Sequence, residues 1–219
     1  MIRRVESEIK ILGINFFMIM VSFAIALIVL STIAGELLNF YPVSFEVIFP
    51  FFVSMVVGEW GRTRADSNFD IIAAQSKSLF CWVLGRYILI FGVSSVFAFF
   101  CMVFSSVFRY ELPIWEVFII YFPPTFFLSS LCMLLGIHCT GEHVATLACG
   151  IVWLIVLLMR GLLRISGTEY IYLFIRYAGN QNPVWLWNKC IITAAGLFIW
   201  GIVYLKCTLR GFPCFFGSH

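Results

Sequence analysis

Long apolar runs separated by short polar stretches dominate this sequence of 219 residues. A helix needs about 20 mainly apolar residues to cross the hydrocarbon core of a bilayer. Continuous runs without strict alternation favour helices over a membrane barrel. The pattern therefore predicts an all-α integral membrane protein with six transmembrane helices, at about residues 14–34, 43–58, 87–108, 114–137, 144–163 and 184–205.

Composition supports this prediction and excludes several classes of protein. Hydrophobic residues make up 62% of the chain and charged residues 11%, whereas soluble domains are about 25% charged. These values exclude a soluble enzyme and a disordered chain, and the net charge of +3 is too small to indicate a nucleic-acid partner. Because no repeat or flexible linker divides the sequence, residues 1–219 are interpreted as a single transmembrane domain.

The distribution of Lys and Arg predicts the orientation, since these residues concentrate on the cytoplasmic side of membrane proteins. With the amino terminus inside, the inner segments carry Arg3, Arg4, Lys10, Arg62, Arg64, Lys77, Arg86, Lys206 and Arg210, and the outer ones carry Arg109, Arg160, Arg164, Arg176 and Lys189. This bias places both termini and residues 59–86 in the cytosol and residues 164–183 outside the cell. We therefore expect a multi-pass protein of the cell (plasma) membrane.

The amino-terminal segment, residues 1–12, has the pattern of an amphipathic helix. Its apolar residues are spaced by three and four, which places Ile2, Val5, Ile9 and Leu12 on one face. Such a helix would lie flat in the inner interface, in contact with lipid, before the first span. A simple juxtamembrane anchor without a partner is the alternative.

The inner segment, residues 59–86, has the features of a docking element. Asp66 or Ser67 can cap a short helix by accepting the free N–H groups of its first turn. Phe69 and Ile72 then share an apolar face that would otherwise be left in water. This favours docking into a soluble partner over a solvated connector.

The layout and the inner segment together resemble the membrane subunit of an ABC transporter of the type-2 permease class. The matching residues are Glu59, Thr63, Ile71-Ile72, Ser76 and Gly85-Arg86-Tyr87. The sequence departs from the family pattern at Gln75, where a proline is usual, so the end of the helix differs. The resemblance covers the whole chain in layout and about 30 residues in motif.

The resemblance implies a coupling helix at about residues 66–75 that grips a separate cytosolic ABC ATPase. The implied coupling residues are Glu59, Arg62, Thr63, Arg64, Asp66, Phe69, Asp70 and Ile72. It also implies a second permease copy, as a homodimer or close heterodimer, with Phe51 and Met55 beside the translocation path. ATP and Mg would be bound by the ATPase, and no cofactor by this chain.

The outer connection, residues 164–183, is expected to contain a helix that starts at Ser166 or Thr168 and runs through Arg176. The resemblance implies that short helices here dip into the outer leaflet between spans five and six. The acidic residues Glu46 and Glu116 are expected to be shallow enough to reach the headgroups. Arg160 and Arg164 share a face that could meet anionic lipid or an acidic cargo group.

Motifs of catalysis and metal binding are missing from the sequence. His138, Glu142 and His143 invite a metal interpretation, but their spacing does not fit a metalloprotease motif, so no metal site is predicted. The chain also lacks a P-loop, so it would not hydrolyse ATP itself.

The function expected from these features is the transmembrane subunit of an ATP-driven exporter of amphipathic or hydrophobic cargo, peptide or lipid-like. Phe-rich spans with few intramembrane charges suit such a cargo better than a sugar or an ion. Two other classes stay open: an intramembrane enzyme that uses dispersed Glu and His side chains, and a non-enzymatic scaffold or sensor partner. On the exporter hypothesis the chain has no catalytic residues of its own.

Overall fold

The computed structural model describes residues 42–61, 79–108, 114–139, 141, 143–178 and 184–209. Across these residues the structure is helical and contains no strand, which confirms the all-α prediction. Several predicted features lie outside the described residues: the amino-terminal helix 1–12, the first span 14–34, and the coupling residues Arg62, Thr63, Arg64, Asp66, Phe69, Asp70 and Ile72.

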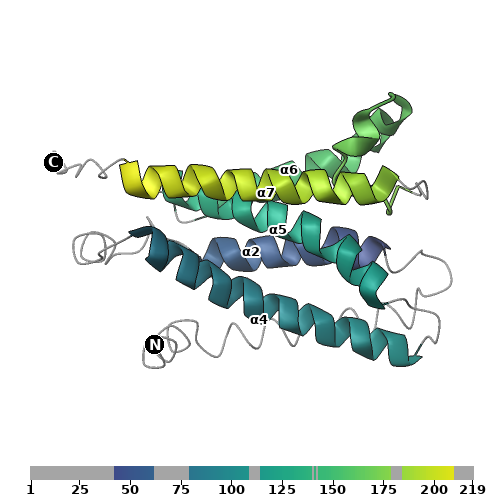
Figure 1. Ribbon diagram of the computed structural model, residues 1–219, viewed down its shortest axis with the longest axis horizontal. Helices are drawn as coiled ribbons and strands as arrows, with labels where there is room; N and C mark the ends of the chain where they lie inside the picture. Colours follow the sequence, from purple (N-terminus) through teal and green to yellow (C-terminus); the bar gives the residue numbers. More distant parts are fainter. Residues whose placement is uncertain are drawn as a thin grey trace.

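Helices follow one another along the described chain and lie roughly side by side (Figure 1). In chain order they are η1 (Pro42–Ile48, a π-helix), α2 (Phe49–Trp60), α4 (Leu79–Phe108), α5 (Ile114–His138), α6 (Val144–Leu158), the 3₁₀ helices η2 (Met159–Arg164) and η3 (Thr168–Tyr170), and α7 (Val184–Leu209).

Four of the described helices are long and apolar enough to cross a membrane. The corresponding stretches are Leu79–Val103, Ile114–His138, Val144–Gly161 and Val184–Thr208. α4 begins at Leu79 rather than near Tyr87, because its first turns pack on α7: Val83 is fully buried and the Phe80 ring lies edge-on to Tyr204 at 5.0 Å. The length and apolar composition of these four helices are therefore those of membrane-spanning helices.

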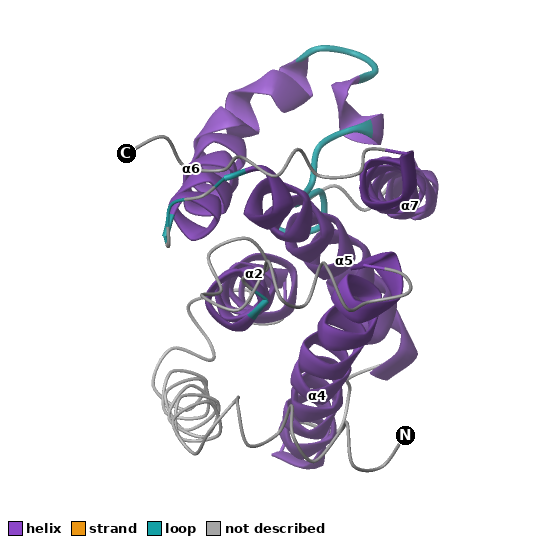
Figure 2. Ribbon diagram, turned by 90° about the vertical axis from the view of Figure 1, so that its left-hand side faces the viewer, coloured by secondary structure: helices purple, strands orange, loops and turns teal. Residues whose placement is uncertain are grey.

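α5 is the central helix of the bundle. Figure 2 shows it among α2, α4, α6 and α7. In its candidate span 61% of the residues are buried, against 28% in α4, 28% in α7 and 11% in α6. Side chains of α5 therefore form much of the interior, while α6 directs most of its apolar side chains outward.

The interior of α5 contains two consecutive prolines, Pro123 and Pro124, within an unbroken helix. Each proline removes one backbone donor from the helix. The carbonyls of Ile119 and Ile120 therefore receive no N–H from the residue four positions on. The hydroxyls of this helix bond other carbonyls: Thr125 Oγ1 donates to the Tyr121 carbonyl at 2.7 Å, and Ser130 Oγ donates to the Phe126 carbonyl at 2.6 Å. These buried hydroxyls are thus paired within their own helix, as an apolar environment requires.

The outer connection does not form the predicted helix through Arg176. Within residues 165–178, only Thr168–Tyr170 is helical, after Gly167 at φ +94°, and residues 171–178 are turns or irregular backbone. The prediction was wrong because the four side chains from Tyr172 to Ile175 are all buried against the bundle. A regular helix would place consecutive residues on different faces, so it could not bury all four on one side.

Close packing of α7 on α5 depends on Gly196. A Cβ atom at this position would lie 2.6 Å from Phe126 Cδ1, whereas one at Gly201 of the same helix would meet nothing within 4 Å. Gly196→Val is therefore expected to destabilise the protein by about 1–3 kcal/mol through overpacking. Thermal unfolding in detergent should show the loss for Gly196→Val and not for the control Gly201→Val; equal midpoints would contradict this packing.

Candidate functional site: a buried charge cluster

The site begins with the π-helix η1, which carries Glu46. Pro50 has no N–H to donate to the carbonyl of residue 46, so a regular α-helix cannot extend across this junction intact. The chain forms a π-helix here instead, and the Trp153 indole of α6 donates to the Val47 carbonyl at 2.9 Å. η1 is thereby fixed to α6, and the Glu46 side chain points into the bundle.

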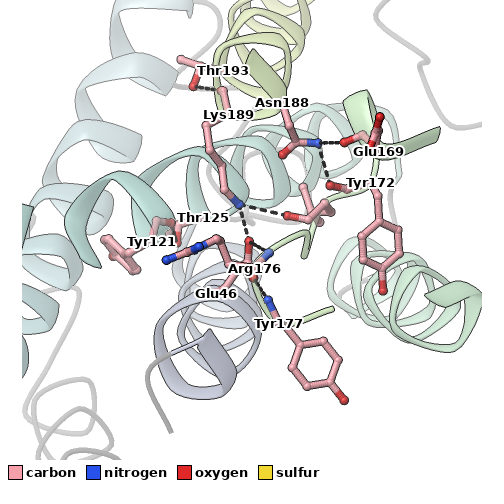
Figure 3. Close-up of polar contacts among 11 residues, drawn as sticks. Glu46, Tyr121, Thr125, Glu169, Tyr172, Arg176, Tyr177, Asn188, Lys189 and Thr193 are labelled. Carbon is pink, nitrogen blue, oxygen red and sulfur yellow. Dashed lines mark hydrogen bonds and ion pairs between the residues drawn. The ribbon is translucent and has the colours of Figure 1, made fainter. Parts of the chain in front are cut away.

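Glu46 is completely buried, and its carboxylate has three donors (Figure 3). The Lys189 amine of α7 lies 2.5 Å from Oε1. The backbone N–H groups of Arg176 and Tyr177 donate to the two carboxylate oxygens at 3.2 and 2.6 Å. One carboxylate therefore joins η1, α7 and the turns between α6 and α7.

The hydrogen bonds around Glu46 and Lys189 can offset the free-energy cost of burying two charged side chains. Lys189 is 2% exposed and also donates to the Leu173 carbonyl at 3.3 Å. A buried ion pair is tolerated only when further hydrogen bonds satisfy its remaining donors and acceptors. The expectation that the Glu46 side chain reaches the headgroups was wrong, because this side chain is buried in the bundle and paired with Lys189, 143 residues away.

A second pair lies nearer the surface. Arg176 binds Glu116 of α5 through its guanidinium, which also lies 5.2 Å from the centre of the Trp185 ring. The two side chains of this pair are 22% and 34% exposed, so water screens them more than it screens Glu46 and Lys189. Glu116 is thus only partly exposed, and its charge is neutralised within the chain.

Arg160, the other outer cation with a described side chain, also has partners within the chain. Its guanidinium donates to the Ala178 carbonyl at 3.1 Å and lies 5.3 Å from the centre of the Tyr177 ring. The side chain of Arg164 lies outside the described part of the structure. These contacts explain cations that the sequence pattern placed on the outer side without a role.

Residues 165–178, called the outer segment below, are attached to α7 by a third contact. The Asn188 amide nitrogen donates to the carbonyls of Glu169 and Tyr172, each at 2.9 Å. Burial, and secondarily the nearby Glu46 carboxylate, raise the pKa of the Tyr172 phenol to about 12, so it stays neutral at physiological pH. Side chains of η1 and α7 therefore satisfy the irregular backbone of the outer segment.

The chemistry of the cluster is that of a neutral anchor. Two carboxylates are balanced by two cations, and each carboxylate is engaged by its own cation. Among the described residues, no group of three His, Cys, Asp or Glu side chains is arranged to hold a metal ion. These contacts can hold the outer segment against the spans. Removal of one of the charges should release the segment.

The predicted coupling residue Glu59 lies at the opposite end of α2. Its carboxylate lies 3.0 Å from His143 Nδ1 and accepts a hydrogen bond from Thr146 Oγ1 at 3.3 Å. At the same end, the Lys206 amine contacts His138 Nε2. The histidines considered for a metal site thus belong to two separate contacts.

Phe51 and Met55, predicted to line a translocation path, lie on the side of α2 that contacts α6. The Phe51 ring is 4.5 Å from the Trp153 ring, and the Met55 methyl would lie 3.0 Å from a Cβ atom at Gly150. Their place beside a path between two subunits stays a prediction.

The two acidic residues of the cluster should differ strongly in their effect on stability. Glu46→Ala leaves a buried amine and two backbone donors unpaired, so we expect it to lower the free energy of unfolding by about 3–5 kcal/mol. Glu116→Ala breaks a partly exposed pair and should cost about 0–1 kcal/mol. Unfolding in a detergent of fixed composition measures both, and equal losses would contradict the assigned burial.

Exchange of the charges of Glu46 and Lys189 tests whether Glu46 acts only as an ion-pair partner or also as an acceptor for the backbone of the outer segment. The double variant Glu46→Lys with Lys189→Glu restores opposite charges but cannot accept the N–H groups of Arg176 and Tyr177. It should therefore remain destabilised by about 1–3 kcal/mol for each donor left unpaired. The control exchange, Glu116→Arg with Arg176→Glu, should unfold near the wild-type midpoint. Full recovery of stability by the first exchange would show that the backbone contacts contribute little.

Comparisons with known proteins give no match for this chain. No family model matches it, and neither a curated protein nor a solved structure is significantly similar. A functional assignment therefore depends on the residues and contacts of the chain itself.

Proposed function

We propose that this chain is the membrane subunit of an ATP-driven exporter, of the type-2 ABC permease class, with ATP hydrolysed by a separate cytosolic subunit. The proposal is supported by where the ends of the helices lie. α2 ends, α4 begins and α7 ends at one end of the bundle, and η1, the end of α4 and the outer segment lie at the other (Figure 1). Residues 62–78, which carry most of the coupling motif, therefore connect two helices at a single end.

The charge distribution supports the cytosolic location of that end. Residues 62–86 contribute Arg62, Arg64, Lys77 and Arg86, and the end of α7 contributes Lys206. Basic residues concentrate on the cytoplasmic side. In the proposed topology six helices span the plasma membrane, the termini are cytosolic, and the outer segment faces away from the cytosol.

An amphipathic or hydrophobic cargo, peptide or lipid-like, fits the described surface and interior. Large apolar side chains are exposed along α4, α6 and α7, among them Phe100, Leu158 and Phe198. The buried charges Glu46 and Lys189 neutralise one another, so this pair is not a site that would attract a small ion. A second permease copy would complete the path on the exposed side, and the ATPase would bind ATP and Mg.

The test is whether a P-loop ATPase binds this chain through residues 62–78. The tagged protein is purified in mild detergent and in lipid discs from its native membrane, and retained ATPase is identified and assayed for stimulated hydrolysis. Phe69→Ala should weaken retention by up to about 1.5–3 kcal/mol, the value of burying one large apolar side chain. Lys77→Ala is the control and should retain the ATPase.

Two outcomes would contradict the proposal at different levels. Absence of any ATPase from wild-type preparations in both detergent and lipid would overturn the permease assignment. Full retention and full stimulation with Phe69→Ala would show instead that residues 66–75 are not the coupling helix.

A further inference from the structure

The last turn of α2 lies unusually close to α5 and α6. A Cβ atom at Gly58 would be 2.4 Å from Thr146 Oγ1 and 2.9 Å from Cys132 Sγ. At Gly61 it would be 2.8 Å from Met133 Sδ. Real Cβ atoms do not approach other atoms this closely, so glycine at these positions lets three helices meet at one point.

Glu59, between these two glycines, adds polar contacts to the same junction. Its carboxylate reaches His143, just before α6, and Thr146, in the first turn of α6. His143 is 59% exposed at its side chain and Glu59 is 29% exposed, so the contact lies at the rim of the bundle. The end of α2 is thereby joined to the start of α6 by packing and by hydrogen bonds.

Buried thiols join α6 to α5 just inside this junction. Cys132 Sγ donates to the Ala145 carbonyl of α6 at 3.7 Å, and Cys149 Sγ donates to the Leu128 carbonyl of α5 at 3.8 Å. Both thiols are buried, at 1% and 0% exposure. The contacts are reciprocal, so α2, α5 and α6 form one packed unit at this end.

We propose that Glu59 is a positioning residue that makes the end of α2 and the start of α6 move as one body. This inference rests on the proposed function, because the coupling segment follows directly after Gly61 in the chain. A displacement of that segment by the ATPase is then passed to α6 as well as to α2. α6 can respond because it is the least enclosed of the four candidate spans among the described residues, with 11% of its residues buried.

The first measurement needs no ATPase. Alkylation of the native cysteines by a membrane-permeant maleimide is followed residue by residue with mass spectrometry. Glu59→Leu and Gly58→Ala should each raise the alkylation rate of Cys132 about tenfold by opening the junction locally. Glu59→Gln, which keeps an acceptor, and Gly136→Ala, where a Cβ atom meets nothing within 4 Å, should leave Cys132 protected.

Alkylation of Cys101, on α4 and remote from the junction, reports whether a variant has lost its fold as a whole. In that case Glu59→Leu is replaced by His143→Leu, which removes the same contact from the exposed partner. Protection of Cys132 at the wild-type level in both Leu variants would overturn the proposal.

The second measurement uses the complex with the ATPase. Glu59→Leu should keep the ATPase bound but lower stimulated hydrolysis by about fivefold or more, the range of a typical coupling energy. The double variant Glu59→Leu with His143→Leu should be no worse than Glu59→Leu alone, since Glu59→Leu already removes the contact with His143. Loss of ATPase retention by Glu59→Leu, as for Phe69→Ala, would make Glu59 a contact residue and overturn the positioning role. If no ATPase binds the wild type, the proposed function fails. The alkylation of Cys132 then still shows whether Glu59 joins the end of α2 to the start of α6.

Discussion

The buried carboxylate of Glu46 is the contact that holds the outer segment, residues 165–178, against the rest of the bundle. A buried irregular backbone is stable only when protein groups take the place of water around its N–H and C=O groups. Glu46 accepts from two such N–H groups, while Lys189 and Asn188 donate to three carbonyls of the same segment. These three side chains thus take the place of water around the backbone of the outer segment, and the charges of Glu46 and Lys189 cancel.

The two ends of α2 use opposite means to connect helices. At its start, a wide π-helix and a long-range ion pair hold segments that are far apart in the sequence. At its end, Gly58 and Gly61 remove side chains altogether so that α2 can touch α5 and α6. A rigid α2 between two such fixed points would transmit a displacement along its length, which is the property that a coupling element requires.

Periodicity and hydropathy predicted the four long apolar helices of the described chain, because span length and apolar composition are local properties. α5 was expected at 114–137 and is found at Ile114–His138, despite two internal prolines. The charge cluster could not be predicted in this way. Glu46 and Lys189 each look like a shallow interfacial residue alone, and only the π-helix and the fold bring them together. The sequence did contain a signal for this cluster: the acids Glu46 and Glu116 were predicted on the same side of the membrane as cations without an assigned role.

The separation of Glu46 and Lys189 has a consequence for biosynthesis. Ribosomes deliver the chain from its amino terminus, so the carboxylate reaches the membrane before its lysine has been made. A further 143 residues must be added before that counter-ion exists. Until α7 is inserted, the nascent protein carries an acid without its final partner, and the outer segment has no anchor. Closure of this end therefore requires α7, and a ribosome that stops before residue 189 releases a chain that cannot complete it.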